Sequence, residues 1–542
     1  MSRRRWHRYW LPLAFAALIL LPAAPALALA AAMAAAGTLR AGRFLVRRRR
    51  ASVRRLDAVV LGTDARGRVV QLTDHELSAH GLIVGASGAG KTTTLVTILS
   101  DQIRRGRPVV AIDMKGSPSF ADDLADAAAA AGQTIKVFTL DGGAHWNPLA
   151  HGNATELKDK LMSTERFTEP HYMRAAERYV QTVLQVLARA RPDRPPTLAA
   201  VVELMDHRRL AIALRDVDRP LRERIQDYLT ALTPDQLSAI RGLQTRLAVL
   251  TESHTGAFLE PPPDLHTPVI DVREALSGSD VVVFSLNSSK YGKLASQVGT
   301  LVVQDLVAAS GERMNELARG HSLEPATIGI DEFSALGADH VIALLARGRE
   351  PGMRTLVATQ ELADLDRAAP GFRDQVLGVT AVKIVHRQDV PESARTIAAM
   401  AGTEEVWEET RQIGGRLLGH DTGRGTRRLT EKFIVHPNQI KTLRTGEAVV
   451  ISKIGGRRPR TVRVAPPRHA TPAPPTPPRH ATPAPPTPPR HARPTPPTPP
   501  RHATPAPPSP SRHATPTPPS PPRHATPTPP SPRAPQRPEL GR

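Results

Sequence analysis

Residues 81–104 read GLIVGASGAGKTTTLVTILSDQIR. Within this stretch, residues 85–92 match the pattern G-x-x-x-x-G-K-[ST]. The apolar run before the pattern predicts a β-strand, and the apolar residues after it recur at helical spacing. A strand, a glycine-rich loop and a helix therefore follow one another in the order that places the loop at a helix N-terminus, where backbone N–H groups can bind an anion.

The loop predicts a site for a nucleoside triphosphate. Gly85, Gly88 and Gly90 allow the backbone to bend so that its N–H groups converge on phosphate oxygens. Lys91 can neutralise the β and γ phosphates, and the hydroxyl of Thr92 can bind Mg²⁺. We therefore predict ATP and Mg²⁺ as ligands. The predicted phosphate-binding residues are Gly85, Ala86, Ser87, Gly88, Ala89, Gly90, Lys91, Thr92 and Thr93.

Two further apolar segments end in polar residues that suit the chemistry of hydrolysis. The first, residues 327–330, is followed by Asp331 and Glu332. Because the carboxyl ends of parallel strands line one ligand crevice, these acids are expected beside the loop. Asp331 is predicted to bind Mg²⁺ together with Thr92, and Glu332 to polarise the attacking water. The second segment ends in Gln360, which is predicted to sense the γ-phosphate.

The apolar segments together predict an α/β fold with a parallel central sheet. Such a sheet requires crossover helices on both of its faces. The predicted strands are residues 82–84, 109–112, 281–286, 327–330, 355–359 and 381–385.

Residues 155–251 have a helical rather than a strand pattern. Two apolar stripes at helical spacing predict helices that pack against one another. One stripe consists of Tyr179, Val180, Val183, Leu184 and Leu187, and the other of Leu221, Ile225, Tyr228, Leu229 and Leu232. We therefore predict an all-helical subdomain over residues 151–265, inserted into an α/β domain formed by residues 56–150 and 266–464.

The net charge of +21 comes entirely from the two ends of the chain. Residues 1–55 contain twelve arginines and no acid, and residues 465–542 contain ten arginines and one glutamate. Residues 56–464 are formally neutral, so the basic composition does not indicate whether they bind nucleic acid. The absence of cysteine excludes disulfides and thiolate-bound metals.

The N-terminal segment predicts a single membrane span. Residues 11–39 carry no charge, and four arginines precede them while eight follow them within residues 40–55. The positive-inside rule then places the ATPase body in the cytoplasm and the anchor in the inner membrane. The alternative is a secretory signal, because the small residues of APALALA, residues 24–30, offer a cleavage site.

The C-terminal segment, residues 465–542, is a repeat. The unit RHATPAPPTPP recurs with variation at a period of eleven residues. Proline at this density removes backbone donors and restricts φ, which predicts a disordered, extended tail rather than a packed domain. A specific docking ligand is the alternative interpretation.

Six blocks in this order resemble the coupling-protein ATPases of bacterial conjugation and type IV secretion, which are related to the FtsK and HerA DNA pumps. The blocks are HGLIVGASGAGKTT, VVAIDMKGSP, HWNPL, FSLNSSKYGKLASQVGTLVVQDL, IGIDEFSAL and ARGREPGMRTLVATQELADL. The resemblance covers residues 62–453. It implies a RecA-like α/β motor with an inserted helical subdomain, a homo-hexameric ring, and ATP-driven movement of DNA or nucleoprotein across the inner membrane.

The resemblance also implies partners and one further catalytic residue. The partners are DNA, either single-stranded with a relaxase or double-stranded, and the channel proteins of type IV secretion. The matching GR block of the family places a catalytic arginine at Arg349, with Arg347 as the alternative. Two other functions stay open: an FtsK-like translocase of duplex DNA, and an ATP-dependent membrane scaffold that recruits secreted proteins.

Overall fold

The computed structural model describes residues 57–164, 169–414 and 420–467. The predicted membrane span at residues 11–39 lies outside these residues, as do residues 468–542 of the predicted proline-rich tail, residues 465–542. Within the described ranges, no helix combines the length and the apolar character that a bilayer crossing needs.

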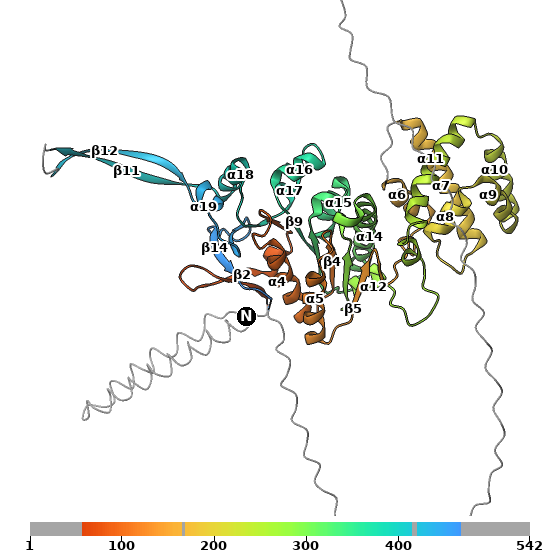
Figure 1. Cartoon of the computed structure of the whole chain (residues 1–542), viewed down its shortest axis with the longest axis horizontal. Helices are drawn as coiled ribbons and strands as arrows, with labels where there is room; N and C mark the ends of the chain where they lie inside the picture. The colour runs from red at the N-terminus through yellow and green to blue at the C-terminus, as the bar shows by residue number, and fades with distance from the viewer. Residues whose placement is uncertain (1–56, 165–168, 415–419, 468–542) are drawn as a thin grey trace, which may run out of the picture. The chain divides into compact units, whose positions relative to one another are not determined.

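A twelve-stranded sheet forms the centre of the fold, with the order β2-β1-β14-β13-β10-β3-β9-β8-β4-β7-β5-β6 (Figure 1). Neighbouring strands are parallel from β10 to β5. These strands are β10 (Val382–Val385), β3 (Gly81–Val84), β9 (Met353–Thr359), β8 (Ala326–Asp331), β4 (Val109–Asp113), β7 (Val281–Ser285) and β5 (Ile135–Thr139). The predicted α/β fold with a mostly parallel sheet is confirmed, and each of the six predicted strands forms.

Antiparallel strands extend both edges of the parallel region, and the sequence patterns did not predict them. Beyond β10 lie β13 (Glu447–Ser452), β14 (Arg460–Val464), β1 (Ala58–Thr63) and β2 (Val69–Thr73), and beyond β5 lies β6 (Gly142–Gly143). The residues that pair along this edge come from the two ends of the described chain, because β1 pairs with β14. The pairing of β1 with β14 spans most of the described chain, whereas β1 with β2 and β13 with β14 are pairs of strands that follow one another in the sequence.

Helices cover both faces of the sheet, as a parallel sheet requires. On one face lie α4 (Lys91–Arg104) and α5 (Pro118–Ala131), and on the other lie α14 (Lys293–Ala318) and α15 (Ala338–Gly348) (Figure 1). Successive side chains of a strand point to opposite faces, so Ile83 packs in the cluster under α4 while Leu82 and Val84 pack in the other.

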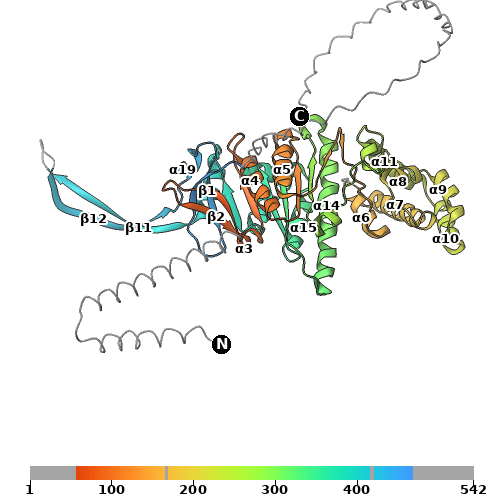
Figure 2. The ribbon, with the colours of Figure 1, turned by 90° about the horizontal axis from the view of Figure 1, so that it is seen from below.

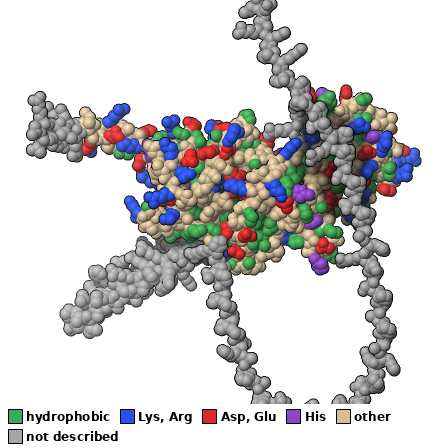
Figure 3. Space-filling view, viewed as in Figure 1, with side chains coloured by type: hydrophobic (Ala, Val, Ile, Leu, Met, Phe, Trp, Pro, Cys, Tyr) green, Lys and Arg blue, Asp and Glu red, His purple; other side chains and the backbone are tan. Residues whose placement is uncertain are grey.

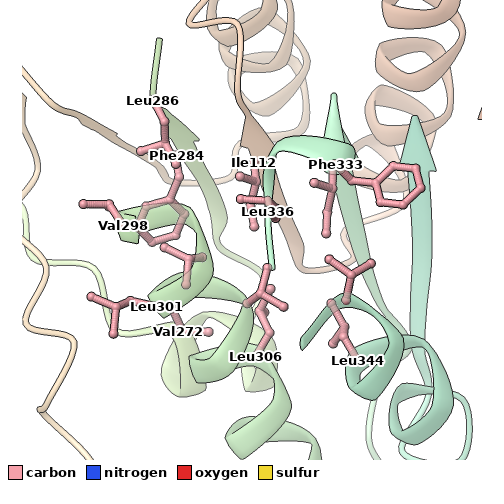
Figure 4. Close-up of a cluster of buried hydrophobic side chains, with 14 of the residues drawn as sticks. Ile112, Val272, Phe284, Leu286, Val298, Leu301, Leu306, Phe333, Leu336 and Leu344 are labelled. Carbon is pink, nitrogen blue, oxygen red and sulfur yellow. The ribbon is translucent and has the colours of Figure 1, made fainter. Parts of the chain in front are cut away.

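The core on the α14 face is shown in Figure 4. Val298, Leu301 and Leu306 of α14 pack there with Ile112 of β4 and Phe284 of β7, and each of these side chains has 0% exposure. Burying one such side chain stabilises the fold by about 1.5–3 kcal/mol. This packing fixes the position of α14 under the carboxyl ends of β4 and β7.

The described residues between β6 and β7 form helices joined by loops, with one isolated β-bridge between His145 and Val269. Figure 2 shows that these helices gather beside α14. They are α6 (Ala154–Met162), α7 (Pro170–Ala190), α8 (Leu198–Leu204), α9 (His207–Ala213), η1 (Leu214–Asp216), α10 (Arg219–Thr230), α11 (Pro234–Thr251), η2 (Gly256–Leu259) and α12 (Val272–Ser277). Lys160 of α6 and Asp305 of α14 form a buried ion pair, Nζ to Oδ1 2.8 Å, which connects the two regions.

Two long strands, β11 (Thr403–Gly414) and β12 (His420–Phe433), form a separate antiparallel sheet. This ribbon connects α18 (Pro391–Ala401) to α19 (Pro437–Lys441) and was not predicted. The remaining short helices lie between strands of the main sheet. They are α3 (Asp74–Leu77), α13 (Ser288–Tyr291), η3 (Phe333–Ala335), α16 (Leu362–Ala368) and α17 (Phe372–Val379).

Candidate nucleotide-binding site

The glycine-rich loop connects β3 to α4 at the carboxyl edge of the sheet. Gly90 is the N-cap of α4 and has φ 112°, and Gly88 has φ 71°, so both occupy the left-handed region that favours glycine. A Cβ on Gly85 would lie 2.5 Å from Cβ of His386. The pattern therefore places glycine where the backbone conformation or a close neighbour requires it.

His386 and the β13 edge support the loop, and no sequence pattern predicted a role for them. Burial lowers the pKa of His386 to about 4, so its imidazole is neutral at physiological pH. Nε2 of His386 is 2.9 Å from Oγ1 of Thr94, and Nδ1 is 2.9 Å from the carbonyl oxygen of Glu447. The N–H of Gly446 donates to the carbonyl of Ala89 at 2.9 Å. These contacts hold the loop from the side of β10 and β13.

Lys91 lies inside the loop. Its side chain is 3% exposed, and Nζ donates to the carbonyl of Gly85 at 2.7 Å and to that of Ala86 at 3.3 Å. Burial lowers the pKa of Lys91, and the carboxylate of Glu332, 4.0 Å away, partly opposes that shift. The ammonium group is therefore positioned where phosphate oxygens would enter the loop.

Asp331 and Glu332 end β8 beside the loop. The Asp331 carboxylate is fully buried and accepts a hydrogen bond from Oγ1 of Thr92 at 2.7 Å. Glu332 has φ 56° and ψ 46°, a left-handed conformation that costs a non-glycine residue about 1–3 kcal/mol. This conformation turns the chain directly after the strand and presents the Glu332 side chain at the carboxyl edge of the sheet.

The order of the strands brings Gln360 between the loop and the acids. β9 lies between β3 and β8, so the residue after β9 is next to both sites. Nε2 of Gln360 donates to Oε1 of Glu332 at 3.0 Å. The structure therefore brings together Lys91, Thr92, Asp331, Glu332 and Gln360, which the sequence analysis assigned to one site.

Lys115 and Asp113 belong to the same cluster, and sequence reasoning missed them. Nζ of Lys115 is 2.8 Å from Oε1 of Glu332 and 3.6 Å from Oδ2 of Asp331. Although burial acts against it, these two carboxylates raise the pKa of Lys115. Burial raises the pKa of Asp113, which ends β4, to about 6. The available signal was the polar run DMKG directly after an apolar strand.

Arg347 and Arg349 lie at the amino ends of the strands, whereas the phosphate loop lies at their carboxyl ends. They lie at the end of α15, just before β9 begins, and both are exposed. Arg349 is close enough to His80, which precedes β3, to lower its pKa further after the larger effect of burial. These are the amino ends of the strands, so the structure does not bring either arginine to the phosphate loop of its own chain.

The residues present fit a nucleoside triphosphate with Mg²⁺. The loop offers backbone N–H groups at the start of α4, with no Cβ at the three glycine positions, and Lys91 supplies a positive charge. The Thr92 hydroxyl and the Asp331 carboxylate are the hard oxygen ligands that Mg²⁺ prefers, and they already lie within 2.7 Å of each other.

Comparison with protein families gives two matches within the described residues. The model described as the TraM recognition site of TraD and TraG matches residues 325–445. The model of the helicase HerA-like C-terminal family matches residues 59–144. The first contains both acids and Gln360, and the second contains the phosphate loop. The chain has the phosphate loop and the fold of a P-loop NTPase, and it is similar to the conjugative coupling proteins. The resemblance predicted from the sequence is therefore confirmed.

Solved structures share the fold of this NTPase at low sequence identity. The unbound bacterial conjugative coupling protein TrwBΔN70 has 14% identity and a TM-score of 0.56, with 77% of this chain and 91% of that chain covered. Plasmid coupling protein TrwB in complex with ADP and Mg²⁺ has 15% identity and a TM-score of 0.52, with 75% and 89% covered. The TrwB complex with the GTP analogue GDPNP has 15% identity and a TM-score of 0.53, with 77% of this chain and 92% of that chain covered. No curated protein matches the sequence.

Proposed function

We propose that the chain is a membrane-anchored ATPase that assembles as a hexamer and couples ATP hydrolysis to the transfer of DNA or nucleoprotein in conjugation or type IV secretion. The observation that carries this proposal is the match of the coupling-protein family model to residues 325–445. Those residues hold Asp331, Glu332 and Gln360 beside the phosphate loop. The TrwB structures with ADP and Mg²⁺ support ATP and Mg²⁺ as ligands.

The side chains of the site suit hydrolysis of the terminal phosphoanhydride. Lys91 and the loop N–H groups would hold the β and γ phosphates, and Thr92 and Asp331 would hold Mg²⁺, which supplies positive charge to the phosphates when bound. Glu332 would accept a proton from the attacking water. The water oxygen would bond to the γ-phosphorus while the bond from that phosphorus to the β–γ bridging oxygen breaks. ADP and inorganic phosphate are the products.

Gln360 and Lys115 would act as positioning residues. Both donate to Oε1 of Glu332, at 3.0 and 2.8 Å. Two donors on one carboxylate oxygen restrict the rotation of the side chain, which leaves Oε2 as the atom that can face the water. The strained backbone of Glu332 limits its freedom in the same way.

The test is ATP hydrolysis by the full-length protein in detergent, measured alone, with single-stranded DNA and with duplex DNA. We expect DNA to raise the rate. Lys91→Ala is the control: it should lose hydrolysis while its thermal unfolding midpoint stays close to that of the parent, because Lys91 bonds only to loop carbonyls and to Glu332. A rate that neither DNA changes would contradict DNA transfer and favour a protein-recruiting scaffold.

A second candidate is translocation of duplex DNA in the manner of FtsK. The match of the HerA-like model to residues 59–144 favours it, because HerA and FtsK are related DNA pumps. Stimulation by duplex DNA alone would support this candidate. Stimulation by single-stranded DNA would support transfer together with a relaxase.

The proposed location is the inner membrane, with one span at residues 11–39 and the ATPase body in the cytoplasm. Deletion of residues 1–55 should release the ATPase into the soluble fraction and weaken its assembly, because anchoring raises the local concentration of subunits. Fractionation and sedimentation measure both effects. Digestion of the body by a protease added outside intact cells would contradict the orientation.

A further inference from the structure

One cavity is lined by basic and uncharged side chains among the described residues. Over the face shown in Figure 3, acidic and basic side chains are interspersed. The cavity, of about 760 Å³, lies between the start of α14, the segment after Glu332, α11 and the end of α6. Lys293 of α14 and Arg246 of α11 line it, and none of the described residues on its wall is acidic. It is therefore suited to a ligand with negative charge.

One face of α14 supplies most of the polar groups in this cavity. These groups lie three, four and seven residues after Lys293, so they share one face of the helix with it. They are Ser296, Gln297 and Thr300. Lys293 is exposed and forms no ion pair with a described residue. Ser334, on the opposite wall, adds a further hydroxyl. The hydroxyls of Ser296 and Thr300 already donate to backbone carbonyls, so the Lys293 ammonium and the Ser334 hydroxyl are the groups open to phosphate oxygens.

No aromatic side chain is among the described residues that line the cavity. The described wall therefore offers contacts to phosphates and not the base stacking that gives many single-strand binders their affinity. We propose that the cavity binds the phosphodiester backbone of nucleic acid, without reading its sequence. This inference rests on the proposed function and assigns the surface by which the ATPase contacts its DNA.

The position of the cavity connects it to the catalytic glutamate. The hydroxyl of Ser296 donates to the carbonyl of Ala335 at 2.5 Å, and the N–H of Gly337 donates to the hydroxyl of Thr300 at 3.4 Å. Ala335 is only three residues after Glu332. Phosphates held on this face of α14 would thus contact the helix that supports the catalytic segment, which gives DNA a direct route to the rate of hydrolysis.

The test compares two lysines on adjacent helices of the full-length protein. Lys293→Ala removes one of the two described cations that line the cavity. Lys290→Ala is the matched control, because Lys290 pairs with Asp141 at 3.0 Å and does not line the cavity. Binding of a fluorescent oligonucleotide, single-stranded or duplex, is measured by anisotropy over a range of salt concentrations, and each variant is checked for the thermal midpoint of the parent.

We expect Lys293→Ala to bind DNA about five-fold more weakly near 0.15 M salt and to reduce the slope of log affinity against log salt by about 0.7–0.9 for each phosphate lost. Lys290→Ala should bind like the parent. Oligonucleotides of different sequence should respond equally. If the parent binds DNA but Lys293→Ala keeps its affinity and slope, or if both variants weaken binding equally, this inference is wrong. If the parent binds neither form of DNA, the proposed function itself fails.

Discussion

At the scale of single residues, Glu332 is surrounded by donors. Gln360 and Lys115 contact the same carboxylate oxygen, and Lys91 is 4.0 Å from it. The side chain is held by contacts from three different strand ends, since these donors follow β9, β4 and β3. Such a carboxylate is positioned before any substrate enters, which lowers the cost of organising the site during the reaction.

We expect Glu332→Gln to bind nucleotide and to lose hydrolysis. The amide oxygen of glutamine can still accept from Gln360 and Lys115, so the local contacts persist, but the amide cannot take a proton from water. The loss should be about 10²–10⁴-fold in rate. A fluorescent ATP analogue measures binding, and phosphate release measures turnover. Loss of nucleotide binding in this variant would contradict the role assigned to Glu332.

At the scale of elements, α14 is in close contact with the segment that follows Glu332. A Cβ on Gly299 of α14 would lie 2.6 Å from Cδ2 of Leu336 and 3.1 Å from Cδ1 of Leu286. A Cβ on Gly311, on the same helix, would meet no atom within 4 Å. The two glycines therefore offer a matched pair of substitutions.

Gly299→Ala should lower stability by about 1–3 kcal/mol, because overpacking forces Leu336 to move. It should also slow hydrolysis, since Leu336 follows Glu332 closely in the chain. Gly311→Ala should instead raise stability by about 0.5–1 kcal/mol, because alanine favours the helical conformation more than glycine does. Thermal midpoints and ATPase rates of both variants check this. Equal effects of the two substitutions would contradict the close contact.

β10 carries a buried lysine that links stability to pH. Lys383 is 2% exposed and donates to the carbonyls of Leu377 and Thr380 at the end of α17, and burial lowers its pKa to about 7. In the unfolded chain the lysine keeps its proton up to about pH 10.4. Between about pH 7 and pH 10.4, unfolding therefore takes up a proton. Raising the pH above 7 should therefore stabilise the fold, by up to about 1.4 kcal/mol per pH unit from this group.

Lys383→Met should remove that contribution. Between pH 7 and pH 9, the thermal unfolding midpoint of the parent should rise more than that of the variant. The difference reports on Lys383 because all other titrating groups contribute equally to both proteins. Differential scanning calorimetry at pH 7, 8 and 9 measures the difference. Parallel curves for parent and variant would show that Lys383 is charged in the folded state over this range.

At the scale of the whole molecule, Arg347 and Arg349 lie at the amino ends of the parallel strands and the phosphate loop lies at their carboxyl ends. Arg349 therefore cannot complete the site of its own chain, although the predicted role in a neighbouring subunit stays open. The test mixes Lys91→Ala with Arg349→Ala, each expected to be inactive alone. A mixed ring contains interfaces that join an intact loop to an intact arginine, so activity should return. If mixed rings form, shown by co-purification of two tags, but no activity returns while Arg349→Ala alone hydrolyses normally, Arg349 is not that residue.

The sequence by itself determined the phosphate loop, the acidic strand end and the α/β class. Each is local: the loop lies within eight residues, the acids follow one apolar strand, and periodicity separates strands from helices. It also predicted Gln360 beside the acids, because the ends of parallel strands share one edge of the sheet, and in the structure Gln360 contacts Glu332.

Only the tertiary structure decided which distant groups join that site. Lys115 reaches Glu332 because β4 pairs with β8, and His386 supports the loop because β10 pairs with β3. Neither pairing leaves a mark in the sequence around these residues, since strand order depends on the packing of the crossover helices on both faces. The α14 cavity and the pairing of β1 with β14 arise in the same way, from contacts between segments that are distant in the sequence.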